Sequence, residues 1–418
     1  MMSSRERINL TLNHIKPDRV PFGLGSGFET GMHVSMVYKL RQALGLDEPG
    51  TPVKVIEPMQ MLGEIGYDLM ELLRIDLVGL SGKRTFLGFS NEGWKQWTMF
   101  DGTPVLVPHA FNTDLEPNGY LLMYPEGDKK ASPCARMPNG GWYFDPIPNP
   151  LPSDIRLNIE DNLVEFTEIS DDEVNYFEQE VNRLINDTDK AIFADFGSTN
   201  FGDVALVPGT WLKNPRGIRD IQEWLISIVT RPNYIKEIFE YQCEIALENL
   251  KKIYRVIGNK ISIVYSSGND FGMQTGLLIS RKSYLDLYQP YSRRINDWIH
   301  QNTQWKTFIH SCGAIKTLIE DFIVTGFDVL NPVQTSASDM DPQELKKLFG
   351  DRIVFFGGGV DTQRTLPFGT PDEVRREVRD RLKIFGRGGG YIFNPIHNIQ
   401  PNIPIENLMA MIDTLLKQ

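Results

Sequence analysis

The feature that most constrains the fold is a regular alternation of short apolar runs with amphipathic segments. From about residue 190 onward, six apolar runs predict strands at 191–197, 260–265, 306–310, 327–331, 352–356 and 390–394. Between and after them, apolar residues at three- and four-residue spacing predict helices at 219–230, 233–256, 281–301, 314–324, 341–349, 371–385 and 405–416. Strands that alternate with helices in this way indicate a parallel α/β fold.

The N-terminal part adds two predicted strands, at 19–24 and 75–80, with helical patterns between them. A total of eight favours a single closed (β/α)8 TIM barrel over a doubly wound open sheet. One such barrel can hold most of a 418-residue chain, so we expect one domain over 1–418. Residues 83–151 interrupt the alternation with Gly, Pro, Asn and aromatic residues. We predict an inserted aromatic-rich β-meander there, serving as a lid or as an oligomer contact such as a homodimer interface.

Charge and cysteine content exclude several classes of protein. The net charge of −11 argues against a nucleic-acid partner, because phosphate contacts need clustered Lys and Arg. No apolar run approaches the roughly 18 residues of a membrane span, and the polar N-terminus does not read as a secretory signal. The widely spaced Cys134, Cys243 and Cys312 form no disulfide framework. We therefore expect a cytoplasmic protein with no membrane partner.

Polar side chains follow five of the predicted strands. In a TIM barrel, functional residues gather at the carboxyl ends of the strands. This rule selects Asp270 and Asp361 as candidate catalytic groups, and Asn331 and Gln334 as candidate hydrogen-bond partners of a substrate. Asp270 has two further interpretations, as a metal ligand or as the cap of a turn.

His310 and Cys312 carry the strongest chemical signal. Residues i and i+2 of an extended strand point to the same side, so this pair offers an imidazole and a thiolate together. Zinc accepts that mixture of ligands. His397, at the end of the last predicted strand, is the best-placed third ligand, and Asp270 can add an oxygen. The alternative is that His310 bonds a neighbouring backbone group and Cys312 is a small buried apolar residue.

Several segments resemble the uroporphyrinogen decarboxylase superfamily. The resemblance rests on the His-Ser-Cys-Gly segment at 310–313, on 326–334, on the Phe-Gly-Gly-Gly-Val-Asp segment at 356–361 and on 394–401, together with the start of the chain from Arg5 to Pro21. It covers most of the chain outside the aromatic segment, and it implies the same (β/α)8 barrel.

The superfamily has two functional branches, and the sequence is closer to one of them. Haem-pathway decarboxylases carry an arginine-containing motif after the first strand, whereas no arginine occurs here between Arg19 and Arg41. Such cationic groups are needed to hold an anionic porphyrinogen. The other branch consists of zinc-dependent methyltransferases that act with corrinoid proteins, and their zinc site is His-x-Cys followed much later by Cys. His310 and Cys312 match the first two positions, while His397 stands at the third.

The resemblance therefore implies a zinc-dependent methyltransferase. It would move a methyl group between a small-molecule donor or acceptor and a corrinoid carried by a partner protein. One alternative is a metal-free, uroporphyrinogen decarboxylase-like carboxy-lyase of porphyrin biosynthesis with Asp270 or Asp361 as its polar centre. A second alternative is a non-catalytic protein that presents the 83–151 segment to a partner such as a corrinoid domain.

Overall fold

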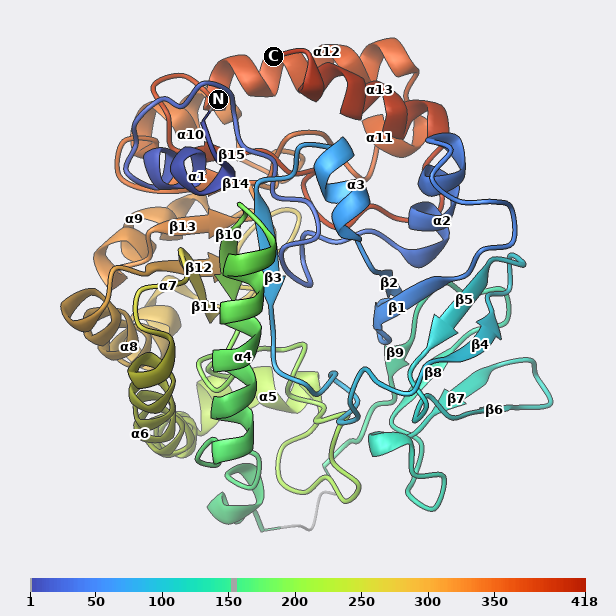
Figure 1. Ribbon diagram of the computed structural model, residues 1–418. Helices are drawn as coiled ribbons and strands as arrows, with labels where there is room; N and C mark the ends of the chain where they lie inside the picture. The colour runs from blue at the N-terminus through green and yellow to red at the C-terminus, as the bar shows by residue number, and fades with distance from the viewer. Residues whose placement is uncertain (1, 152–155) are drawn as a thin grey trace.

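A curled parallel sheet forms the centre of the computed structural model, which describes residues 2–151 and 156–418 (Figure 1). Its seven strands follow the spatial order β15-β14-β13-β12-β11-β10-β3. Their bounds are β3 (Leu77–Leu80), β10 (Ala191–Ala194), β11 (Ile263–Ser267), β12 (Lys306–His310), β13 (Val329–Asn331), β14 (Val354–Phe356) and β15 (Tyr391–Ile392). The predicted α/β class and seven of the eight predicted strands are confirmed.

The first predicted strand, 19–24, is reduced to a single bridge. Phe22 pairs in parallel with Phe393 just beyond β15, and its carbonyl accepts a hydrogen bond of 2.8 Å from the N–H of Asp76 beside β3. Pro21 has no N–H to offer to a ladder, and Gly25 turns the chain away with a φ of +78°. The segment thus contacts both edges of the curled sheet, but a closed barrel of eight strands is not confirmed.

Helices cover the outside of this sheet (Figure 1). The predicted helix 281–301 is interrupted by a π-helical turn at Tyr284–Tyr288. Pro290 lies two residues after this turn, and it has no N–H to donate to the preceding turn. The helices are α1 (Ser4–Leu12), α2 (Val34–Ala43), α3 (Tyr67–Leu72), α4 (Asp171–Asp187), α5 (Ile221–Thr230), α6 (Pro232–Ile257), α7 (Arg281–Ser283), α8 (Gln289–Asn302), α9 (Lys316–Thr325), α10 (Pro342–Phe349), α11 (Thr365–Phe368), α12 (Pro371–Phe385) and α13 (Ile405–Leu416), with short 3-10 turns at Pro125–Gly127 and Ile159–Asn162.

Two small sheets lie on one side of the molecule (Figure 1). The first has the order β2-β1-β5-β4 and the second, an antiparallel meander, the order β6-β7-β8-β9. The expected helical patterns between 24 and 75 account for α2 and α3. The same stretch also contains β1 and β2, because residues 53–57 alternate between buried and partly exposed positions. The bounds are β1 (Val53–Glu57), β2 (Leu62–Gly63), β4 (Lys95–Thr98), β5 (Pro104–Val107), β6 (Thr113–Leu115), β7 (Leu121–Met123), β8 (Ala135–Met137) and β9 (Asp145–Pro146).

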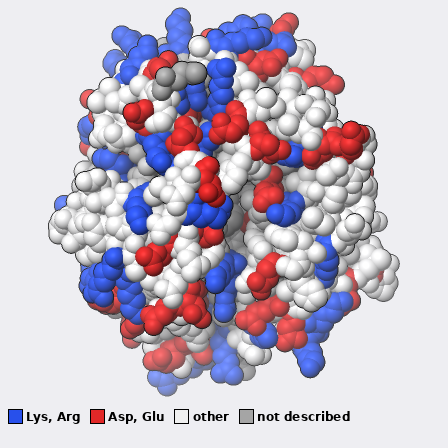
Figure 2. Space-filling view, viewed as in Figure 1, with Lys and Arg blue, Asp and Glu red and all other residues white. Residues whose placement is uncertain are grey.

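Large side chains fill the inside of the curled sheet. Phe193, Tyr265, Phe308 and Phe356 pack against one another there, with Ile8 and Leu12 of α1 in the same cluster. The interior is therefore a packed core, and space for a ligand is left only towards the carboxyl ends of the strands. Acidic and basic side chains are interspersed around a hollow on the face shown in Figure 2. None of the helices in the described ranges is long and apolar enough to cross a bilayer.

Candidate functional site

His310 is the last residue of β12, and the neighbouring strand fixes its ring. Its Nδ1 lies 2.7 Å from Asn331 Oδ1, while Asn331 Nδ2 donates to the backbone carbonyl of Phe356 at 3.0 Å. Because the amide nitrogen is used in that way, Oδ1 is the acceptor and the ring hydrogen of His310 lies on Nδ1. This leaves Nε2 with a free lone pair, the form of imidazole that binds a metal ion.

The thiol of Cys312 lies next to that nitrogen. The distance from Sγ to His310 Nε2 is 3.4 Å. The backbone N–H of Cys312 donates to Asp270 Oδ1 at 2.6 Å, and the same oxygen is 3.8 Å from His310 Nε2. Burial, followed by the negative charge of Asp270, raises the pKa of the Cys312 thiol well above its usual value. The thiolate form therefore requires a cation in this group.

His397 joins the group from the loop after β15. Its ring centroid lies 5.5 Å from that of His310 in an edge-on arrangement. Burial, and then His310, lowers the pKa of His397 to about 3, so the ring is neutral near pH 7, as a metal ligand must be. Its Nδ1 accepts a hydrogen bond of 2.8 Å from the Asn398 backbone. Ligation through Nε2 therefore requires the ring hydrogen to move to Nδ1, at the expense of that bond.

The chemistry and spacing of these three side chains fit a zinc ion. One potential ligand atom each from His310, Cys312 and His397 lies within 4.8 Å of the others. Tetrahedral bonds of about 2.0–2.3 Å place neighbouring ligand atoms about 3.3–3.8 Å apart. The pair formed by His310 and Cys312 already has that separation, so an adjustment of about 1 Å by His397 completes the set. Three protein ligands are typical of a catalytic zinc site, which keeps one position open.

The two amides predicted to bind substrate form hydrogen bonds that hold parts of this site in place. Both polar ends of Asn331 are engaged, as described above. Gln334 Oε1 accepts from the Gly313 backbone N–H at 2.7 Å, and its Nε2 donates to Gln274 Oε1 at 3.1 Å. Gly313 has a φ of +90°, and a Cβ there would lie 2.5 Å from the backbone of Gly272. These amides are thus positioning groups for the His310–Gly313 turn.

Asp361 lies after β14, as the sequence predicts, but the described hydrogen bonds of its carboxylate are local. Its Oδ1 accepts hydrogen bonds from the backbone N–H groups of Gln363 and Arg364, at 2.7 Å and 3.2 Å. This is the geometry of a carboxylate that caps a turn before α11. Asp270, in contrast, contacts both members of the His310–Cys312 pair.

Three further carboxylates near the same end of the sheet were not predicted from the sequence. These are Glu29, Asp195 and Asp203, and Tyr265 from β11 donates its hydroxyl hydrogen to Glu29 Oε1 at 2.9 Å. Burial, then Glu29, raises the pKa of Asp195 to about 6. Burial, followed by the charges of Asp270, Glu29 and Asp195, raises the pKa of Asp203 well above its usual value. Like charges that share a buried region disfavour ionisation in this way.

One of the three could have been found from the sequence. Asp195 directly follows β10, so the strand-end rule that selected Asp270 also applies to it. Glu29 lies in a glycine-rich loop, and Asp203 lies well beyond the end of β10. Only their position in space connects them with the site.

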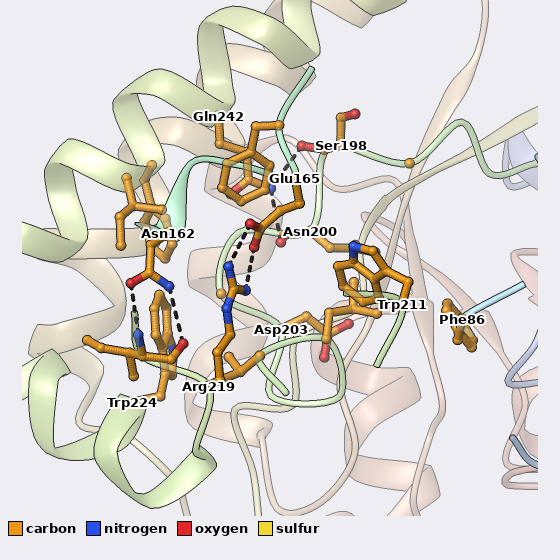
Figure 3. A pocket seen from close by; sticks show the side chains of 18 of the residues that line it. Phe86, Asn162, Glu165, Ser198, Asn200, Asp203, Trp211, Arg219, Trp224 and Gln242 are labelled. Atoms are coloured by element: carbon orange, nitrogen blue, oxygen red, sulfur yellow. Dashed lines mark hydrogen bonds and ion pairs between the residues drawn. The ribbon is translucent and has the colours of Figure 1, made fainter. Parts of the chain in front are cut away.

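Two cavities adjoin these carboxylates, and Asp195 lines both. The larger has a volume of about 260 Å³ and also includes Asp203. The smaller, of about 110 Å³, includes Glu29 and Tyr265. Figure 3 shows the larger one, with the pair formed by Glu165 and Arg219 in its wall. None of His310, Cys312 and His397 lines either cavity, so the metal-ligand group lies outside both spaces.

The curled parallel sheet places this chain in the parallel α/β class, with polar side chains at the ends of its strands. Comparison with known proteins agrees with that class. Residues 214–417 match the family model of uroporphyrinogen decarboxylase (URO-D). This match confirms the resemblance to the uroporphyrinogen decarboxylase superfamily.

Individual relatives are more distant. The chain is 33% identical over 145 residues to the uroporphyrinogen decarboxylase of Psychromonas ingrahamii, which is 34% of this chain and 38% of that protein. It is 26% identical over 190 residues to that of Chlorobium phaeobacteroides, which is 43% of this chain and 51% of that protein. The matched stretches thus span about half or less of these relatives' length. A solved methyltransferase from Methanosarcina mazei shares the fold, with a TM-score of 0.55 and 14% identity over 100% of this chain and 99% of the other.

Proposed function

We propose that this protein is a zinc-dependent methyltransferase that moves a methyl group between a small molecule and a corrinoid carried by a partner protein. The observation that carries the proposal is the convergence of His310, Cys312 and His397 within 4.8 Å at the carboxyl ends of two strands of the sheet. The fold shared with a methyltransferase and the match to the uroporphyrinogen decarboxylase family support it.

The residues around this group prepare it for such chemistry. Asn331 keeps Nε2 of His310 free, and the Asp270 carboxylate holds the Cys312 backbone beside it. When bound, zinc supplies a Lewis acid that lowers the pKa of a coordinated thiol, hydroxyl or water. Desolvation, and then the neighbouring His310, lowers the pKa of His397 and keeps that ring neutral. In this proposal Asp270 is the acid–base group nearest to the reacting atoms.

Zinc content tests the proposal directly. Protein purified without chelator should contain about one zinc per chain by elemental analysis. His310→Ala and Cys312→Ser should each lose it, while Cys134→Ser should keep it, because the Cys134 thiol bonds the Met123 backbone carbonyl and burial raises its pKa to about 12. Wild-type protein without stoichiometric zinc contradicts the proposal.

The second candidate is a metal-free carboxy-lyase that acts on a porphyrinogen, favoured by the names of the curated relatives. The charges weigh against it. Uroporphyrinogen is a polyanion, whereas Glu29, Asp195, Asp203 and Asp270 gather at the strand ends. Formation of coproporphyrinogen from uroporphyrinogen by the metal-stripped protein would favour this candidate over the first.

Three further parts of the proposal concern the closure of the sheet, the 83–151 segment and the compartment. We propose that Phe22 closes the curled sheet into a barrel, that the 83–151 segment is an insertion that serves as a lid or a homodimer contact, and that the protein acts in the cytoplasm. Crosslinking of the full chain with a corrinoid protein, with and without the 83–151 segment, tests whether that segment contacts the partner.

A further inference from the structure

The cavity of about 260 Å³ lies between the end of β10 and the helices α5 and α6. Its wall contains four charged residues, Glu165, Asp195, Asp203 and Arg219. Arg219 Nη1 and Nη2 lie 2.7 Å and 2.8 Å from the two Glu165 oxygens, so these opposite charges offset each other. Within the described part of the chain, no Lys or Arg forms an ion pair with Asp195 or Asp203. When both are ionised, the cavity therefore carries an excess of negative charge.

A deeply buried amide adds a free acceptor to the wall. Gln242 is 2% exposed, and its Nε2 donates to the backbone carbonyls of Ser198 and Asn200 at 2.9 Å and 3.1 Å. These two bonds fix the orientation of the amide, so its other end must be the oxygen. Gln242 Oε1 is buried and has no hydrogen-bond partner among the described residues, and the same is true of Asn200 Oδ1. Buried acceptors left in this state indicate a missing donor.

The Asp203 carboxylate belongs to the wall of the same cavity. Its Oδ1 accepts a single hydrogen bond from the Ala205 backbone at 2.9 Å. Its Oδ2 approaches Gly268, where an added Cβ would lie 2.7 Å away. The glycine thus makes room for a carboxylate that forms no ion pair with any described residue.

Aromatic rings form much of the remaining wall. Phe86 and Trp211 lie on the side of the cavity away from Trp224 (Figure 3), and Phe166 and Phe239 also line it. The faces of such rings attract cations that carry little bound water. A small, strongly hydrated metal ion gains nothing from them, whereas an alkylated ammonium ion contacts both the rings and the carboxylates.

We propose that this cavity binds an organic ammonium ion that carries methyl groups. The ion would lie between the Asp195 and Asp203 carboxylates and the aromatic wall, and any N–H or O–H it carries would donate to Gln242 Oε1. Binding itself is independent of zinc. The identity of this ion as the small-molecule substrate rests on the proposed methyltransferase function.

A pair of isosteric probes tests the proposal. Choline and 3,3-dimethylbutan-1-ol have the same shape, and they differ in the charge on the branched centre. Calorimetric titration of the full chain in a chelating buffer at pH 8 should show choline binding at least tenfold more tightly than the neutral alcohol. Asp203→Asn should weaken choline binding at least tenfold. Glu237→Gln removes the same charge from the exposed side of α6 and should change it less than twofold.

A second variant and a metal arm make the outcome decisive. Trp211→Leu leaves both carboxylates in place and removes one aromatic ring, so it should weaken choline binding. Circular dichroism should show that each variant is folded. Equal affinity for the two probes overturns the ammonium site, and so does binding of Mg²⁺ with none of choline when Mg²⁺ is titrated after the chelator has been removed by dialysis. Because the chelating buffer removes zinc, such a failure leaves the zinc content of the untreated protein as a separate result. Conversely, the wild type could bind choline and yet contain no zinc when purified without chelator. That result would support this site and contradict the proposed function.

Discussion

Removal of the Asn331 side chain provides a sharp test of how His310 is prepared for a metal. Asn331 is fully buried, and it links His310 Nδ1 to the backbone carbonyl of Phe356 through bonds of 2.7 Å and 3.0 Å. In Asn331→Ala both bonds are lost. The His310 ring is then free to rotate and to place its hydrogen on Nε2, the atom that faces Cys312.

Two magnitudes follow from this geometry. Loss of the partner that orients a ligating histidine weakens metal binding by about 10–100-fold. Two buried hydrogen bonds at about 1–1.5 kcal/mol each, with polar groups left unpaired, reduce the free energy of unfolding by about 2–4 kcal/mol. In Asn331→Asp the carboxylate still accepts from His310 Nδ1, so zinc binding should stay within about tenfold of wild type.

The assay is competition for zinc against a chromogenic chelator, with thermal unfolding measured in parallel. Asn407→Ala is the matched control, because Asn407 on α13 is also buried and its side chain also forms two hydrogen bonds, both of them to backbone carbonyls. It should lose stability and keep zinc affinity. The reasoning is refuted if folded Asn331→Ala binds zinc as tightly as Asn407→Ala does.

Two further predictions concern the buried carboxylates. In Gly268→Ala the new Cβ would lie 2.3 Å from the Tyr265 hydroxyl oxygen and 2.7 Å from Asp203 Oδ2. We therefore expect the free energy of unfolding, measured by chemical denaturation, to fall by about 1–3 kcal/mol and choline binding to weaken. Unchanged values for both would contradict the described packing. The Asp195 carboxyl has a pKa of about 6 in place of 3.8, so between about pH 4 and 6 the unfolded state is ionised first and stability falls as the pH rises. At about 1.4 kcal/mol for each pKa unit, Asp195→Asn should raise the free energy of unfolding by about 2–3 kcal/mol at pH 8 and by almost nothing at pH 3, and equal effects at both pH values would rule out this origin.

The sequence predicted most of the regular structure, for a local reason. Strand 306–310 and helices 371–385 and 405–416 have the predicted bounds, because their apolar periodicity and end signals lie within the segments themselves. The prediction of a strand at 19–24 was wrong, because Pro21 and a turn at Gly25 limit the pairing of this segment. Such a segment is apolar enough for a strand, but it cannot form a regular ladder.

The candidate site also has a part that follows from local sequence and a part that depends on the packing of the strands. His310 and Cys312 are two residues apart, so strand geometry alone places their side chains together, and the rule of strand ends adds His397. The partnership between His310 and Asn331 depends on the register of β12 and β13. The rule of strand ends selects Asn331 as a candidate substrate ligand, and the register of the two strands also brings its side chain to the His310 ring.

The sequence by itself determined the alternation of strands and helices and the chemical identity of the residues at the strand ends, since both depend on interactions within a few residues. Tertiary structure alone decided that Glu29, Asp203 and Asp270 act on one another across more than 200 residues of chain, and that Gln242 closes a cavity with an unsatisfied oxygen. The electrostatic field and the shape of a cavity depend on distances through space and on burial. Those quantities exist only once the helices have packed against the sheet.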